Sequence, residues 1–143
     1  MAKISGLIFS ADPIKDTMAA AKHLLEFTDE VVIIYSKSYK DCKSFISRNK
    51  DKRTRIFYAL RLGYPEPLRH YGISLCRYDH IAMLDVDERF SDTGKAKALL
   101  DSGTADTYLL YRKELDGRNK NIYTKQYRLF SKNKINWRGY LHE

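Results

Sequence analysis

The sequence has little of what marks a secreted or membrane-bound protein. It holds only two cysteines, Cys42 and Cys76, far apart and without metal-ligand spacing, so we expect reduced thiols in a cytosolic protein rather than a disulfide framework. No apolar run approaches the roughly 18 residues that cross a bilayer. The first apolar stretch stops at Asp12 and Pro13, which is typical of a first core strand and not of a signal peptide.

Acidic residues are also in short supply. The 18 aspartates and glutamates face 26 lysines and arginines, which gives a formal net charge of +8. This balance indicates an anionic partner such as nucleic acid, a phosphate-bearing small molecule or an acidic membrane surface. The excess is concentrated between positions 112 and 138, where only Glu114 and Asp116 oppose the bases. Such a run can equally form a solvated face.

No internal repeat, low-complexity segment or linker divides the chain, so we expect one domain over residues 1–143. Alternating strand and helix patterns in the first two thirds predict a mostly parallel sheet with helices on both faces. After Asp106 the pattern becomes mostly β, which predicts antiparallel strands at the edge of that sheet. The predicted strands are 4–10, 30–35, 54–60, 80–84, 107–115, 121–130 and 134–141, and the predicted helices begin near 13, 41, 65 and 93.

Several residues predict where the helices begin and end. Asp12 and Asp41 are candidate N-caps of the first two helices, because a side-chain oxygen can accept hydrogen bonds from the first free N–H groups. Asp92 or Thr93 is expected to cap the fourth helix, and Gly103 to end it. The buried face of the first helix is expected to carry Met18, Ala21, Leu24 and Leu25.

The stretch IAMLDVDERF, residues 81–90, holds the strongest chemical signal. An apolar strand runs directly into Asp85, Asp87 and Glu88, and ligands of open α/β sheets bind where strands end. Because side chains alternate along a strand, Asp85 and Asp87 are expected to point to the same side. Two such carboxylates repel unless one is protonated or a cation lies between them. We therefore predict a Mg²⁺ or Mn²⁺ site that binds a diphosphate, although capping and exposed loop acids explain the same tripeptide without a metal.

The same segment resembles a known family. DHIAMLDVDERF resembles the aspartate motif of the GT-A glycosyltransferases, in particular glycosyltransferase family 2. The likeness extends, in order, to the opening ISGLIFSADP and EVVIIYSKSYKD, to PLRHYGISLC before the aspartate strand, and to the ending YRLFSKNKINWRGYLHE. The aspartate motif and the RLF…HE ending are its specific parts. The resemblance implies an α/β, Rossmann-like GT-A sandwich that forms a single minimal catalytic domain.

The resemblance also implies a reaction. A sugar would pass from a nucleotide-diphosphate donor, UDP- or GDP-linked, to a carbohydrate, lipid or protein acceptor, with inversion at the anomeric carbon. Mn²⁺ or Mg²⁺ is the implied cofactor, with Asp87 and His142 beside the metal and Asp85 at the ribose or at the metal through water. Inversion requires a base that takes the acceptor proton, and the candidates are Glu143 and Glu88.

Further positions are candidates for binding the donor. Arg69 falls where the family has an arginine that faces the donor. Tyr35 stands where the family usually has an acid that contacts the nucleobase, so its ring is a candidate for stacking instead. Ser10 is a candidate for meeting the base through backbone groups. Arg128 is a candidate for facing the diphosphate, although simple in–out alternation explains RLF equally well.

Two different functions stay open. A Toprim-like metal-dependent nucleic-acid enzyme also places Asp-x-Asp at a strand end, but it needs a glutamate after an earlier strand, and the first strand here ends in FSADP. A basic module that binds nucleic acid or polysaccharide without catalysis would bind in a steeply salt-dependent manner. Under the leading hypothesis no stable nucleic-acid complex is expected, and peripheral membrane contact stays open.

Overall fold

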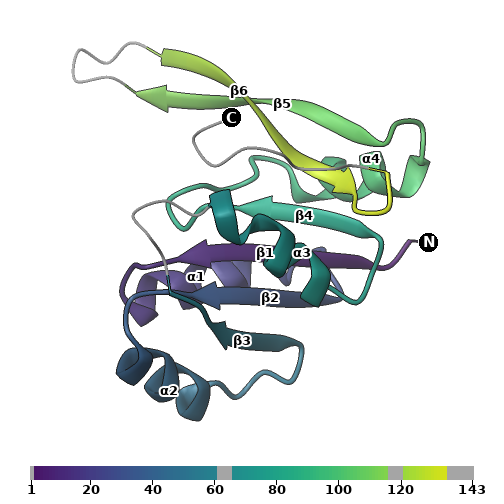
Figure 1. Cartoon of the computed structure of the whole chain (residues 1–143). Helices are drawn as coiled ribbons and strands as arrows, with labels where there is room; N and C mark the ends of the chain where they lie inside the picture. The colour runs from purple at the N-terminus through teal and green to yellow at the C-terminus, as the bar shows by residue number, and fades with distance from the viewer. Residues whose placement is uncertain (1, 61–65, 116–120, 135–143) are drawn as a thin grey trace.

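The computed structural model describes residues 2–60, 66–115 and 121–134, which form one six-stranded sheet with helices on both faces (Figure 1). No helix in these three ranges is long and apolar enough to cross a membrane. In chain order the elements are β1 (Ile4–Ser10), α1 (Ile14–Leu24), β2 (Glu30–Tyr35), α2 (Tyr39–Arg48), β3 (Thr54–Tyr58), the 3₁₀ turn η1 (Glu66–Leu68), α3 (Arg69–Leu75), β4 (His80–Leu84), α4 (Thr93–Ser102), β5 (Thr107–Leu115) and β6 (Asn121–Ser131).

The strand order is β3-β2-β1-β4-β6-β5. The first four strands pair in parallel, and β6 and β5 add antiparallel strands at one edge. This confirms the predicted α/β class with a mostly parallel sheet and antiparallel C-terminal strands. The predicted strand 134–141 lies almost wholly outside the described residues.

The core consists of two apolar layers, one on each face of the sheet. The larger layer packs side chains of α1, α2 and α4 against the sheet, and the smaller one packs α3. Every residue of β1 and β2 is buried, as their continuous apolar runs predict for strands covered on both faces. Gly72 lets α3 approach closely, because a Cβ there would come within 2.6 Å of the Phe9 ring.

The predicted helix ends are right in part. Asp92 caps α4 by accepting from the Lys95 N–H, and Gly103 ends it with φ of 60°. Asp12 does not cap α1, whose N-cap is Pro13 without a side-chain bond. In α2 the cap is Ser38, whose hydroxyl accepts the Asp41 N–H at 3.0 Å and donates to the Asp41 carboxylate at 2.8 Å, a pairing that the aspartate alone does not reveal.

The buried face of α1 is rotated from the prediction. Ala21 and Leu24 are buried as expected, Leu25 is partly buried, and Met18 is 41% exposed. Thr17 takes the inward position one turn below Ala21, because its hydroxyl bonds both the Ser10 hydroxyl and the Pro13 carbonyl.

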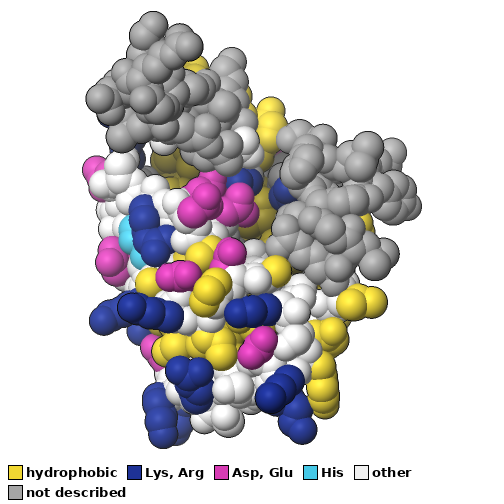
Figure 2. Space-filling view, turned by 90° about the vertical axis from the view of Figure 1, so that its left-hand side faces the viewer, with side chains coloured by type: hydrophobic (Ala, Val, Ile, Leu, Met, Phe, Trp, Pro, Cys, Tyr) yellow, Lys and Arg dark blue, Asp and Glu magenta, His cyan; other side chains and the backbone are white. Residues whose placement is uncertain are grey.

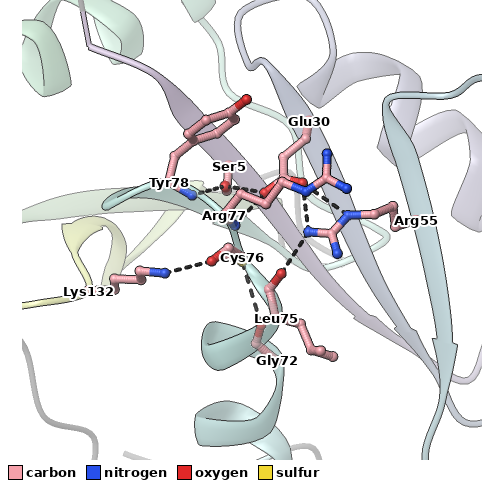
Figure 3. Close-up of polar contacts among 9 residues, drawn as sticks. All are labelled: Ser5, Glu30, Arg55, Gly72, Leu75, Cys76, Arg77, Tyr78 and Lys132. Atoms are coloured by element: carbon pink, nitrogen blue, oxygen red, sulfur yellow. Dashed lines mark hydrogen bonds and ion pairs between the residues drawn. The ribbon is translucent and has the colours of Figure 1, made fainter.

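A buried polar network closes the amino ends of the strands (Figure 3). Glu30, whose side chain is 4% exposed, accepts hydrogen bonds from the Ser5 hydroxyl at 2.6 Å, the Arg77 N–H at 2.7 Å and the Arg55 guanidinium at 2.8 Å. Arg55 also donates to the Leu75 carbonyl at 2.7 Å. Burial alone would raise the pKa of Glu30, but these donors outweigh it and lower the pKa below its ordinary value.

Candidate active site

The strand order has a switch point between β1 and β4. β1 is followed along the chain by β2 on one side, while β4 lies on its other side. Ligands of open α/β sheets bind at such a point, beyond the carboxyl ends of the strands. Figure 2 looks onto this end of the sheet, and it shows acidic side chains gathered in its upper part and basic side chains spread over its lower part.

The three acids form a turn and not a continuation of the strand. β4 ends at Leu84, and the Glu88 N–H donates to the Asp85 carbonyl at 3.0 Å. The premise of that expectation, that Asp85 and Asp87 continue the strand, is therefore wrong, because the chain turns between them. The Asp87 side chain is exposed, while that of Asp85 is half-buried.

Arg128 lies against two of these acids. Its guanidinium donates to Asp85 at 3.1 Å and to Glu88 at 3.0 and 3.3 Å, and its side chain is only 10% exposed. Glu88 also accepts the Asp85 N–H at 2.8 Å. In the described residues, then, a buried arginine offsets much of the charge that ends the apolar strand.

A β-bulge aims Arg128 at the turn. Tyr108 of β5 pairs with Leu129 of β6, while the next residue Leu109 pairs with Tyr127, so Arg128 is the extra residue. Bulges re-aim side chains in this way and are common beside active sites. Arg128 and Leu129 are both buried, and the simple in–out alternation considered for RLF is wrong.

The pKa of Asp85 is raised above its ordinary value despite this arginine. Partial burial raises its pKa, and the neighbouring carboxylates of Glu88 and Asp87 raise it further. The guanidinium groups of Arg128 and Arg69 lower it, but the net shift is upward. The ionised form is therefore under-stabilised, which is the condition in which an added cation binds favourably.

A cleft of about 450 Å³ opens beside the turn. Its lining combines apolar side chains with charged residues of both signs, among them Asp87, Asp92, Arg89, Lys95 and Lys113. Phe90, Tyr111 and Gln126 also line it. Apart from Asp87, none of these residues is predicted from the sequence as part of a site, because the packing of α4 under the β5–β6 hairpin brings them together and no local motif encodes it.

Two predicted donor-binding residues lie at the same end of the sheet. Arg69 begins α3 and approaches the Met83 sulfur at 3.6 Å, close enough to act on the charge of Asp85. Ser10 ends β1, but its side chain is buried between the Thr17 hydroxyl and the Asp12 N–H, and its carbonyl accepts the Ser36 N–H. Ser10 therefore shapes the β1–α1 loop.

Tyr35 is a core residue. Its ring is fully buried and packs edge-on against Phe45 at 5.1 Å, and its hydroxyl donates to the Asp12 carbonyl at 2.6 Å. The expectation that this ring stacks on a nucleobase is wrong, because neither face reaches solvent.

The basic C-terminal run is not a uniform solvated face in the part that the structure describes. Arg128 is buried and paired, and the Lys132 ammonium donates to the Cys76 carbonyl at 2.6 Å. Lys113 and Lys134 are exposed. His142 and Glu143, the candidates for metal binding and for the base, lie outside the described residues.

The described ranges contain no group of three or more His, Cys, Asp or Glu side chains placed to hold a metal ion. A magnesium ion needs only one or two protein carboxylates when phosphate and water supply the rest. None of the ion pairs between described residues involves Asp87. Asp85 and Asp87 thus fit a metal that arrives with a phosphate, and they do not form a metal cage by themselves.

The sheet order and the antiparallel edge form a mixed α/β fold of the GT-A-like, nucleotide-diphospho-sugar transferase type, which solved structures share. No protein-family model matches the chain, and no curated protein sequence matches it. Solved structures do resemble it. One is the 4-diphosphocytidyl-2C-methyl-D-erythritol synthase of Anaerococcus prevotii DSM 20548, with a TM-score of 0.61, 15% identity, and coverage of 92% of this chain and 72% of that one.

Two further solved structures give the same result. The bifunctional IspDF of Campylobacter jejuni has a TM-score of 0.62 at 15% identity, over 93% of this chain and 42% of that one. Another 4-diphosphocytidyl-2C-methyl-D-erythritol synthase has a TM-score of 0.56 at 15% identity, over 92% and 76%. The likeness establishes the fold, and it does not single out glycosyltransferase family 2.

Proposed function

We propose that this chain binds a nucleotide-diphosphate sugar at the carboxyl ends of β1 and β4 and transfers the sugar to an acceptor in the adjoining cleft. The observation that carries the proposal is the acidic turn after β4, where burial leaves the pKa of Asp85 raised beside an exposed Asp87. A site that holds more negative charge than its arginines offset suits a cation and the diphosphate that comes with it. The net charge of +8 favours the same anionic ligand.

Asp87 and Asp85 are the residues that would hold a Mn²⁺ or Mg²⁺ ion. Such an ion supplies positive charge to the diphosphate as it leaves. Arg128 and Glu88 fix the turn on which both aspartates lie. Arg69, at the start of α3, adds positive charge on the side of Asp85.

The cleft suits the acceptor. It combines an aromatic ring, Phe90, with hydrogen-bonding groups such as Gln126 and Lys95, and neither sign of charge dominates its rim. Rings and scattered polar groups of this kind match the mixed surface of a sugar or of a hydroxyl-bearing amphiphile. The acceptor oxygen would attack the anomeric carbon while the bond from that carbon to the diphosphate oxygen breaks.

The acceptor hydroxyl must lose its proton to a base. Glu88 is poorly suited, because its oxygens already accept from Arg128 and from the Asp85 N–H. The family resemblance leaves Glu143 as the candidate.

Calorimetric titration with UDP, GDP and CDP, each with and without Mn²⁺, tests the proposal. We expect at least one nucleotide to bind, and its affinity to fall at least about tenfold without the metal or in the Asp87→Asn variant. Asp106→Asn, which changes an exposed acid just before β5, is the matched control. Absence of binding by all three nucleotides would refute the proposal.

Nucleotidyl transfer is the second candidate, because the structural relatives are synthases of a diphosphocytidyl compound. One feature of this chain disfavours it. The β1–α1 loop reads Ser10-Ala11-Asp12-Pro13, without the glycines that let a backbone loop cradle a polyphosphate. Release of pyrophosphate from a nucleoside triphosphate would favour this candidate, and release of a nucleoside diphosphate from a sugar nucleotide would favour the first.

A Toprim-like enzyme and a non-catalytic basic module have less support. β1 ends without the glutamate that a Toprim-like site requires, and two bases of the C-terminal run are already bound within the protein. A cytosolic location remains a proposal, consistent with Cys42 and Cys76 being free and buried.

A further inference from the structure

A histidine on α1 holds the segment that follows the acidic turn. The Phe90 N–H donates to His23 Nε2 at 3.0 Å across 67 positions of sequence. The two rings lie parallel, with centroids 6.3 Å apart and planes 14° apart. The Phe27 ring packs edge-on against the Phe90 ring, with centroids 5.5 Å apart. The backbone of this segment is thus tied to a helix through one side chain.

The tied segment belongs to the candidate site. Phe90 lies two residues after Glu88, which holds Arg128, and two residues before Asp92, the N-cap of α4. Glu88 to Asp92 all line the cleft. A shift of the Phe90 backbone would therefore move the acidic turn and one wall of the cleft together.

The contact requires an uncharged imidazole. Nε2 accepts only while it carries a lone pair, so the ring hydrogen must be on Nδ1, which faces Glu26 at 3.8 Å. Protonation of Nε2 would set two N–H groups against each other. Two charged groups act on the ring, Glu26 from the α1–β2 connection and Arg89 from the segment itself. Burial lowers the pKa of His23, Glu26 raises it and Arg89 lowers it, and the net shift is downward.

We propose that His23 is a positioning residue, whose neutral imidazole accepts the Phe90 N–H and so fixes the segment Glu88–Asp92 at the mouth of the cleft. The consequence for ligand binding rests on the proposed function, whereas the positioning itself does not. Because the folded protein favours the neutral ring, the contact is complete at neutral pH and is lost as the pH falls through the acid range.

Amide hydrogen exchange tests the positioning without any ligand. We expect the protection factor of the Phe90 N–H to fall about tenfold in His23→Leu, the loss of roughly one hydrogen bond. In the unmodified protein the same protection should hold at neutral pH and fall only as the pH drops below 6.5, the ordinary pKa of histidine, because the pKa of His23 is lowered. His23→Gln retains an acceptor that does not titrate, so its protection should stay constant over that range. An unchanged Phe90 amide in His23→Leu would overturn the proposal. His80→Gln, which changes a histidine at the start of β4, should leave the amide as it is.

A pH profile of nucleotide binding tests the consequence. If the unmodified protein binds a nucleoside diphosphate with Mn²⁺, its affinity should fall more steeply toward about pH 5 than that of His23→Gln. The two proteins could instead show the same pH profile of affinity, even though the Phe90 amide of the unmodified protein loses its protection at low pH. That result would overturn the role of His23 in the site and would leave the proposed function intact. Absence of nucleotide binding at every pH would refute the proposed function, and the exchange experiment would still decide whether His23 positions the segment.

Discussion

Two clusters of arginine and carboxylate lie at opposite ends of the same sheet, and they differ in how completely the protein satisfies them. At the amino end Glu30 is 4% exposed, and a hydroxyl, a backbone N–H and Arg55 all donate to it. At the carboxyl end Asp85 is 47% exposed and accepts from the Arg128 guanidinium at 3.1 Å. The first cluster is closed, and the second opens toward a cleft.

The difference appears in the two pKa values. Burial raises both, but the donors around Glu30 outweigh it, whereas the arginines beside Asp85 do not outweigh burial and two further carboxylates. A carboxylate with a lowered pKa stabilises the fold in its ionised form, and one with a raised pKa is under-satisfied until a cation arrives. The amino end therefore suits a structural role, and the carboxyl end is where we propose that the ligand binds.

The largest expected effect is at the amino end. Glu30→Leu should destabilise the protein by about 3–5 kcal/mol, because it leaves Arg55 and the Arg77 N–H without their buried acceptor. Urea unfolding measures the loss.

The matched variant is Glu30→Leu combined with Arg55→Met, which removes both charges. It should recover part of the stability, since an apolar pair can replace a buried ion pair. A destabilisation below about 1 kcal/mol in Glu30→Leu would mean that the hydrogen bonds of the cluster at the amino end stabilise the fold no more than those at the carboxyl end.

An intermediate effect is expected for Arg128→Gln. The variant leaves Glu88, 12% exposed, with one fewer donor, but Asp85 can turn toward water. The expected destabilisation is about 1–3 kcal/mol, less than at Glu30. Thermal and urea unfolding measure it, with the exposed Lys113→Gln as control. A loss as large as that of Glu30→Leu would show the second cluster to be structural.

The sequence predicts most of the fold because local patterns encode it. The mostly apolar runs of β1 and β2 are buried along their whole length, and Asp92 with Gly103 marks both ends of α4. The N-cap is predicted wrongly where a second candidate residue lies nearby in the sequence. Ser38 competes with Asp41, and Pro13 leaves Asp12 outside the helix.

The site is less predictable, because its geometry depends on residues that meet only in the folded chain. The aspartate motif predicts where charge gathers, but it does not reveal that the chain turns after Leu84 or that a bulge brings Arg128 to Asp85. Tyr35 illustrates the opposite error. The family resemblance places Tyr35 where the nucleobase is contacted, yet the packing of α2 through Phe45 buries its ring.

The pH dependence of stability should have opposite signs at the two ends. The lowered pKa of Glu30 means that its contribution is present above the ordinary glutamate range and is lost as the pH falls through the folded-state pKa. The raised pKa of Asp85 means that stability is lost as the pH rises through its folded-state pKa. The free energy of unfolding of Asp85→Asn, taken relative to that of the unmodified protein, should therefore increase from about pH 3 to about pH 8. The same difference for Glu30→Gln should decrease over this range. Unfolding free energies measured across this range check the signs, and parallel curves would contradict the comparison.

The Asp87→Asn variant should change stability the least, and it is the variant that tells most about function. Its side chain is exposed and none of the described ion pairs involves it, so Asp87→Asn should alter the free energy of unfolding by no more than about 0.5 kcal/mol. The same change removes half of the negative charge that would meet a divalent ion, and Mn²⁺-dependent nucleotide affinity should fall at least about tenfold. If the cluster at the carboxyl end serves ligand binding, Asp87 should contribute to binding and not to folding. If Asp87→Asn were instead to destabilise the protein as much as Arg128→Gln does, the turn would be part of the scaffold, and the two ends of the sheet would be alike.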